Sequence, residues 1–235
     1  RERLIGRVDT FVKQHPAPLE AAGLRWLAAA GARVPAVLEE SRERLVLERI
    51  PTGTLSAAGE EELGRMLATV HSAGVPAFGS LPAPGPFFVG RCELESPEGD
   101  DWNDYYLQHR CLPLARRVGL AREVEQVIVD APVEPPARLH GDLWAGNVLA
   151  DRSGRPWLID PAAYGGHREV DLAMLDLFGE IPPRAIAAYD EVVPLADGWR
   201  ERIPLWQLFP LLVHAVLFGG GYVRQSHELA NRLSR

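Results

Sequence analysis

The stretch that decides the fold reads HGDLWAGNVLA, from His140 to Ala150, and WLIDPAAYGGHREVDLAML follows it from Trp157 to Leu175. Asp142 and Asn147 have the Asp-to-Asn spacing of a catalytic loop for phosphoryl transfer. Such a loop places a carboxylate near the hydroxyl that receives phosphate and an amide oxygen near a metal ion. An Asp/Asn-rich turn is common by itself, but the whole string is much less common. The string therefore predicts phosphoryl-transfer chemistry.

Two acidic residues downstream fit the same chemistry. Asp160 follows the apolar strand 157–159 and precedes Pro161, so it is either a turn residue or a second magnesium ligand. The loop before it favours the metal role. Asp171 stands at the start of an apolar helix, where it could be an N-cap. We favour a buried Asp171 that supports the catalytic loop together with His140.

One basic residue differs in kind from all the others. The chain has 25 Lys and Arg residues, of which only Lys13 is lysine. Chance could leave one lysine anywhere, but a compact ammonium is not equivalent to a guanidinium at a phosphate site. Lys13 ends the strand-like segment RVDTFVK, and Glu20 falls in the first turn of the next predicted helix, where it could simply favour the helix dipole. A strand Lys paired with a helix Glu is also the arrangement that binds nucleotide phosphates in protein kinases.

The order of predicted elements gives the fold class. Strands are predicted in the segment ending at Lys13, at 34–40 and at 44–50, with a helix from about 19 to 30 between the first two. Further helices are predicted at about 57–71, 102–117 and 120–130, and the chain is mainly helical from Val170 on. Residues 74–100, rich in Pro and Gly, read as an irregular, ordered insertion. This order predicts an α+β fold of two lobes, with a small strand-rich N-lobe at 1–53 and a larger helical C-lobe at 54–235. The kinase-type loop and the Lys13–Glu20 pair then favour a protein-kinase-like fold whose N-lobe binds nucleotide.

Composition excludes several classes of function. The net charge of −7 argues against nonspecific nucleic-acid binding. The most apolar run, 205–218, is interrupted by Gln207, Pro210 and His214, so we expect a core helix and no membrane span. With no secretory signal at the start of the chain and only Cys92 and Cys111 as thiols, we expect a cytoplasmic protein without a structural metal.

The combined strings resemble the fructosamine kinase (ketosamine kinase) family, relatives of the aminoglycoside phosphotransferases. The matching pieces are HGDLWAGN, IDPAAYGGHREVDLAML, FVK at 11–13, LGRMLATVH at 63–71 and LFGGGY at 217–222. The resemblance covers nearly the whole chain and implies ATP-dependent phosphorylation of the 3-hydroxyl of ketosamines, free or protein-bound. The product decomposes, so the reaction would support deglycation.

The resemblance also implies roles for single residues. Asp142 matches the catalytic base of the family, and Asn147 and Asp160 match its Mg²⁺ positions. Lys13 matches the lysine that binds the ATP phosphates, with Glu20 as its partner. The segment Glu48, Arg49 and Ile50 matches the hinge strand, whose backbone would bind adenine. Four aromatic side chains, by their flat amphipathic faces, could pack on the substrate: Trp144, Trp102, Tyr105 and Tyr106. For Trp144 a place in the core is an equal alternative.

The sequence departs from the family pattern in two places. Ala145 stands where the family usually has Ser, which is a mild change. The glycine-rich loop that the family has before Lys13 is absent. We therefore expect a chain that lacks its first segment.

Three other functions remain as alternatives. A phosphotransferase acting on an aminoglycoside, choline or homoserine would share Asp142, Asn147 and Asp160, but the GHRE and LFGGGY strings favour a fructosamine kinase. A non-catalytic nucleotide-binding module would explain the absent glycine-rich loop, although the retained polar residues argue against it. A metallohydrolase built on His140, Asp142, Asp160 and His167 would need clustered histidines, and no HxH or HxxxH pairing is present.

Overall fold

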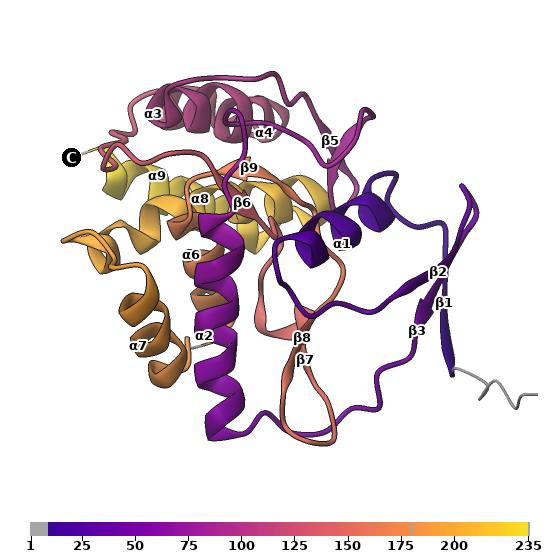
Figure 1. Ribbon diagram of the computed structural model, residues 1–235. Coiled ribbons are helices and arrows are strands. Elements are labelled where there is room, and N and C mark those ends of the chain that lie inside the picture. Colours follow the sequence, from indigo (N-terminus) through magenta and orange to yellow (C-terminus); the bar gives the residue numbers. More distant parts are fainter. Residues whose placement is uncertain (1–8, 180, 235) are drawn as a thin grey trace, which may run out of the picture.

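The computed structural model describes residues 9–179 and 181–234. A small sheet lies at one side and a body of helices at the other, with the β7–β8 hairpin (Val148–Ala150 and Pro156–Leu158) between them (Figure 1). This is the α+β arrangement of two lobes that the sequence predicts. The division at residue 53 stays a prediction, and Arg7 and Val8 of the predicted first strand lie outside the described residues.

The sheet has the order β1–β3–β2, with both pairs antiparallel. Its strands are β1 (Thr10–Gln14), β2 (Val37–Glu40) and β3 (Arg44–Glu48). Helix α1 (Glu20–Ala29) packs Ala21 and Leu24 against Leu45 and Leu47 of β3, which gives this lobe its own small core. Because β1 leads into α1 through a short loop, the end of the strand and the first turn of the helix are neighbours.

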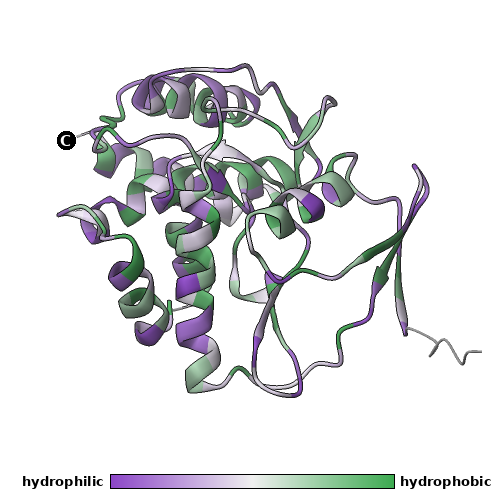
Figure 2. Cartoon of the chain, in the orientation of Figure 1, coloured by the Kyte–Doolittle hydropathy of each residue, from purple (hydrophilic) through white to green (hydrophobic). Residues whose placement is uncertain are grey.

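Among the described residues, the helical lobe is built on five longer helices. Helices α2 (Ala57–Ser72) and α7 (Pro183–Val192) lie side by side (Figure 1). Polar and apolar residues alternate around α2 (Figure 2), and its buried residues include Leu63, Leu67 and Val70. The other three are α6 (Glu169–Leu177), α8 (Trp199–Phe218) and α9 (Gly221–Leu233). In the part of the chain that the structure describes, no helix combines the length and the apolar character that a membrane span requires.

The middle of the chain differs in detail from the prediction. The helix predicted at 102–117 is present as α3 (Trp102–Tyr105), a π-helical turn (Tyr106–Cys111) and α4 (Leu112–Val118). The helix predicted at 120–130 is only α5 (Ala121–Val124), because β-branched residues follow and the N–H of Ile128 donates to Leu233 at the end of α9. The segment 74–100 contains an ordered hairpin, β4 (Phe87–Val89) and β5 (Cys92–Leu94).

Candidate active site

Two short antiparallel pairs enclose the loop that carries Asp142. Strand β6 (Ala137–Leu139) leads into the loop and pairs with β9 (Tyr164–Gly166), while β7 leaves the loop and pairs with β8. Gly141 has φ +79°, and a Cβ there would lie 2.0 Å from the Ala162 carbonyl oxygen. Only glycine allows this turn, which sets the direction of the next residue, Asp142.

The loop rests on a buried carboxylate at the start of α6. Asp171 accepts hydrogen bonds from the backbone N–H groups of His140 at 2.7 Å and Gly141 at 2.9 Å. Its Oδ2 also lies 3.2 Å from Nε2 of His71 on α2, whose Nδ1 is 2.8 Å from the Tyr189 hydroxyl on α7. Burial opposes ionisation of Asp171, but these partners hold its pKa below the ordinary value. Three helices thereby fix the loop.

His140 links the loop to the segment before Asp160. Its Nε2 lies 2.9 Å from the Ile159 carbonyl oxygen, and its Nδ1 accepts from the N–H of Asp142 at 3.3 Å. A neutral ring protonated on Nε2 satisfies both contacts, and burial lowers the pKa of His140 in agreement with a neutral ring. His140 and Asp171 therefore lie beneath the loop, away from any reacting atoms.

Asp142 has the environment of a general base. Burial raises its pKa from its ordinary value of 3.8 to about 6, with Asp160 and Asp171 adding to the rise and the Asn147 amide opposing it. Asn147 donates from Nδ2 to the Asp142 backbone oxygen at 2.8 Å and to its Oδ2 at 3.2 Å. A carboxylate whose pKa lies near neutrality accepts a proton more readily than an ordinary exposed one.

Lys13 lies between two carboxylates that come from different segments. Its Nζ is 2.7 Å from Oε2 of the buried Glu20 and 3.2 Å from Oδ1 of Asp160. Burial alone would lower the pKa of Lys13, but the two carboxylates raise it above its ordinary value. Asp160 has φ +53°, a left-handed conformation that Asp tolerates better than most residues. The ammonium is therefore charged and held in place.

Asn147 and Asp160 together suit a magnesium ion. The N–H of Ile159 donates to the Asn147 backbone oxygen at 3.0 Å, which brings the two segments together. Since Nδ2 of Asn147 is used by Asp142, its Oδ1 is the amide atom left for a metal. Mg²⁺ is commonly bound by one or two protein oxygens plus phosphate oxygens, so this donor set fits. Within 9–179 and 181–234, no three His, Cys, Asp or Glu side chains gather into a metal site.

Three cavities meet at these acidic residues. The first, of about 300 Å³, is lined by Phe11, Leu47, Glu48, Arg49, Ile50, Leu149, Ile159 and Asp160, among others. The second, of about 460 Å³, contains Lys13, Glu20, Phe88, Gly90, Arg91, Asp142 and Asp160. The third, of about 340 Å³, contains Asp142, Trp144, Met174, Phe178, His214, Phe218 and Tyr222. Asp160 is shared by the first two cavities and Asp142 by the last two, so the three form one row.

Predicted nucleotide and substrate residues lie along this row of cavities. Glu48, Arg49 and Ile50 lie in the first cavity, at the end of β3. Trp144 is 39% exposed and lies in the third cavity beside Asp142. A Cβ at Gly146 would lie 2.2 Å from the Trp144 ring. The glycine lets the ring fold over the loop, and the alternative of a core position for Trp144 is wrong.

The structure corrects the prediction for Trp102. It is 5% exposed and packs on Tyr105, Tyr106 and Trp206 in the core of the helical lobe. The aromatic residues of α3 and the π-helical turn therefore face inward, and none of the three lines the cavities described above. Sequence periodicity could not distinguish an aromatic face on the core from one on the site.

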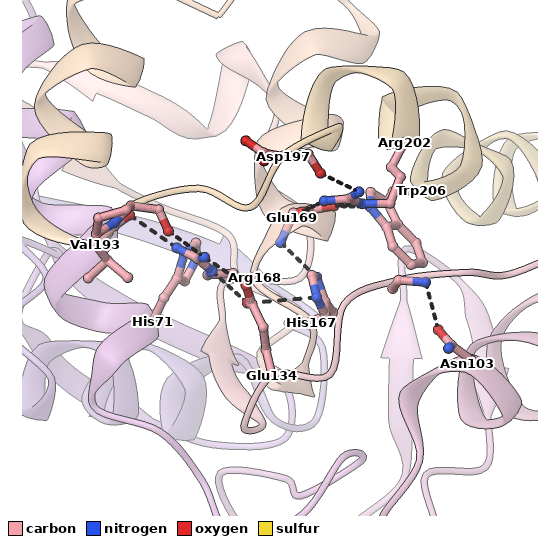
Figure 3. A network of polar contacts seen from close by, with 12 residues as sticks. His71, Asn103, Glu134, His167, Arg168, Glu169, Val193, Asp197, Arg202 and Trp206 are labelled. Carbon is pink, nitrogen blue, oxygen red and sulfur yellow. Dashed lines mark hydrogen bonds and ion pairs between the residues drawn. The ribbon is translucent and has the colours of Figure 1, made fainter.

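His167 also belongs to the interior. Figure 3 shows it between Glu134 and the Glu169–Arg202–Trp206 network. Arg202 donates to both carboxylate oxygens of Glu169, at 2.8 and 2.6 Å, and the Trp206 indole donates to Glu169 at 2.9 Å. These bonds attach α8 to the start of α6. The structure does not bring His167 to Asp142.

Several residues of the site were not predicted. Arg91 and Gly90 come from the turn between β4 and β5, and His214 and Phe218 come from the last turns of α8. The apolar triplet Phe87–Val89 directly before Gly90 could have indicated a strand that ends in a turn. The three consecutive glycines after Phe218 could have indicated a sharp turn.

Comparison with known proteins identifies the family. Residues 17–235 match the sequence profile of the family described as fructosamine kinase. The chain belongs to the fructosamine kinase family. It is 38% identical to a Thermus thermophilus protein named "probable ketoamine kinase", over 93% of this chain and 84% of that protein. A solved structure from Thermobifida fusca, named "putative fructosamine-3-kinase", is 40% identical, with a TM-score of 0.86, over 96% of this chain and 85% of that one.

More distant structures confirm the kinase-like fold. The choline kinase LicA of Streptococcus pneumoniae is 15% identical, with a TM-score of 0.56, over 97% of this chain and 86% of that one. A gentamicin complex of APH(2″)-IIa is 14% identical, with a TM-score of 0.53 over 95% of this chain and 82% of that one. As a fructosamine kinase by family, the chain is an enzyme of the kinase type that phosphorylates a sugar.

Proposed function

We propose that this enzyme transfers the γ-phosphoryl group of ATP to the 3-hydroxyl of a ketosamine, with Asp142 as the base. The observation that carries the proposal is the row of three cavities. Adenine would occupy the first, against the backbone of Glu48–Ile50, the phosphates the second, beside Lys13, and the sugar the third, beside Trp144. Asp142 lies at the junction of the phosphate and sugar cavities, where the hydroxyl and the γ-phosphate would meet.

The residues of the chain divide the work of the reaction. Asp142 accepts the hydroxyl proton as the sugar oxygen forms its bond to phosphorus and the bond to the ADP oxygen breaks. Lys13, aimed by Glu20, holds the phosphates with a fixed positive charge. Asn147 and Asp160 would hold Mg²⁺, which when bound supplies positive charge against the transferred group. The products are the phosphorylated ketosamine and ADP.

The cellular role follows from the acceptor. A phosphorylated ketosamine is unstable, so the reaction would remove glycation products from amines, free or protein-bound. Because ATP is plentiful in the cytoplasm, we place the enzyme there. The net charge of −7 favours a small sugar amine over nucleic acid as the partner.

A competition assay tests the proposal. Purified protein is given fructosyl-lysine, ribulosyl-lysine, choline and an aminoglycoside at equal concentrations with ATP and Mg²⁺, and the phosphorylated products are identified by mass. We expect a ketosamine to be phosphorylated fastest. Faster phosphorylation of choline or of the aminoglycoside would reject the ketosamine and leave the kinase fold unaffected.

A further inference from the structure

We propose that Phe178, Phe218 and Tyr222 form a subsite for the amine substituent of the ketosamine, and that it takes an uncharged alkyl or aryl group in preference to the backbone of a free amino acid. The inference rests on the ketosamine kinase activity proposed above. It adds a specificity that the sugar and phosphate contacts do not supply.

The subsite continues a chain of aromatic rings that starts beside Asp142. The ring centroids of Trp144 and Phe178 are 6.1 Å apart, and those of Phe178 and His214 are 5.1 Å apart. His214 lies 5.1 Å from Tyr222, which is 6.0 Å from Phe218. The rings come from the catalytic loop, the end of α6, α8 and α9. They form a wall that leads outward from the acceptor site.

The outer rings of this wall are accessible. Phe218 is 63% exposed and Phe178 is 43% exposed. Exposed large apolar side chains that gather at the rim of a cavity mark a binding surface. Covering such rings with a hydrocarbon group removes apolar area from water and is favourable in proportion to that area.

The backbone between α8 and α9 is shaped to bring Tyr222 back onto this wall. Gly219 has φ 64° and ψ −149°, and Gly220 has φ 54° and ψ −119°. These conformations are essentially restricted to glycine. The sharp turn they make lets Tyr222, in the first turn of α9, contact His214 on α8.

The charges at the cavity argue against a free amino acid as the amine. Among the residues that line it, Asp142 is the only Asp or Glu, and Lys and Arg are absent. The α-carboxylate of an Nα-linked amino acid would lie two bonds from the amine nitrogen and would find no cation on the wall. A substituent that begins with methylene groups or a ring, such as a lysine side chain joined through Nε, meets only apolar faces.

The geometry of the substrate puts the substituent at this wall. The amine is carried by C1 of the sugar, two carbons from the C3 hydroxyl that must reach Asp142. The substituent therefore starts within a few bonds of the reacting oxygen. The cavity that contains Lys13 and Asp160 beside Asp142 is taken by phosphate. The substituent therefore extends along the cavity that holds Asp142, Trp144 and the aromatic wall.

The test compares ketosamines that share one sugar. Fructose adducts of benzylamine, methylamine and glycine are assayed for kcat/KM with ATP and Mg²⁺. We expect the benzyl adduct to exceed the glycine adduct by about tenfold. In Phe218→Ala the ratio of benzyl to methyl adduct should fall toward one, and Tyr222→Leu should lower it as well. Ile128→Ala, which removes another exposed apolar side chain, should keep the wild-type ratio.

Each outcome of these assays either supports or rejects the subsite. Equal kcat/KM for the three adducts, a faster glycine adduct, or an unchanged ratio in both folded variants would overturn the subsite while the ketosamine kinase activity stands. If the wild type phosphorylates choline or an aminoglycoside and no ketosamine, the proposed function fails and the subsite fails with it. Thermal melting of each variant shows that it is folded before the ratios are compared.

Discussion

Lys13 is the residue at which charge and shape are most clearly separable. Its ammonium is held 2.7 Å from Glu20 and 3.2 Å from Asp160. Lys13→Arg keeps the charge but introduces a planar fork that cannot occupy the same point. We expect kcat/KM for ATP to fall by about tenfold or more, because the phosphates would be misplaced.

The control for Lys13 is the reverse exchange at a surface ion pair. Arg25 on α1 pairs with Glu40 at 2.7 Å and is 55% exposed. Arg25→Lys should leave kcat/KM within about twofold, since exposed pairs contribute little. Near-normal turnover of Lys13→Arg would show that the site needs only a positive charge.

We expect Asp142 to be required for catalysis and, when ionised, to lower the stability of the folded protein. Asp142→Asn removes the base, so kcat should fall by about 10²- to 10⁴-fold while ATP binding is retained. Burial raises the pKa of Asp142 to about 6, so the ionised side chain destabilises the fold above that pH. The variant should therefore be more stable at pH 8, by roughly 1–3 kcal/mol.

The pH dependence of the stability difference between Asp142→Asn and the wild type tests the sign of this effect. Below about pH 4 Asp142 is protonated in both the folded and the unfolded chain, so the stability gain of Asp142→Asn should disappear there. It should grow as the pH rises from 3.8 to about 6 and stay constant above that pH. Over the same range, wild-type kcat/KM should fall as the pH drops below 6, because the base becomes protonated. Denaturant unfolding at several pH values measures the first effect, and equal stability of the two proteins at pH 8 would contradict it.

The β4–β5 hairpin is the element whose contribution was least foreseen. Its strands bury Phe87, Val89 and Cys92, and its turn places Arg91 in the phosphate cavity. We expect Arg91→Ala to raise the KM for ATP by about fivefold, with a smaller effect at high salt because Arg91 is exposed. Glu93→Ala changes an exposed charge on the same hairpin and should leave this KM unchanged. Equal effects of the two substitutions would show that the hairpin matters only for folding.

Across the whole molecule, the sequence predicts best what lies close together along the chain. Asp142 and Asn147 share one loop, and Lys13 and Glu20 are separated by one short connection, so local spacing places each pair. Arg91, His214 and Phe218 reach the site from segments far from the loop, and only tertiary packing brings them there. The prediction for Trp102 was wrong because a helical aromatic residue can face the core or the site with the same periodicity.

The last prediction concerns the two lobes together. The cavities proposed for adenine and phosphate are lined by residues of the small sheet and by Asp142, Leu149 or Asp160 of the helical lobe. A ligand that binds both sides of the folded chain raises its melting temperature by mass action. ATP with Mg²⁺ should therefore stabilise the protein more than ATP alone, and Asp160→Ala should abolish the additional effect of Mg²⁺. Asp130→Ala, which removes an exposed carboxylate, should keep it. A magnesium effect that survives in Asp160→Ala would show that Asp160 is not the ligand and would leave Asn147 and the phosphates to hold the ion.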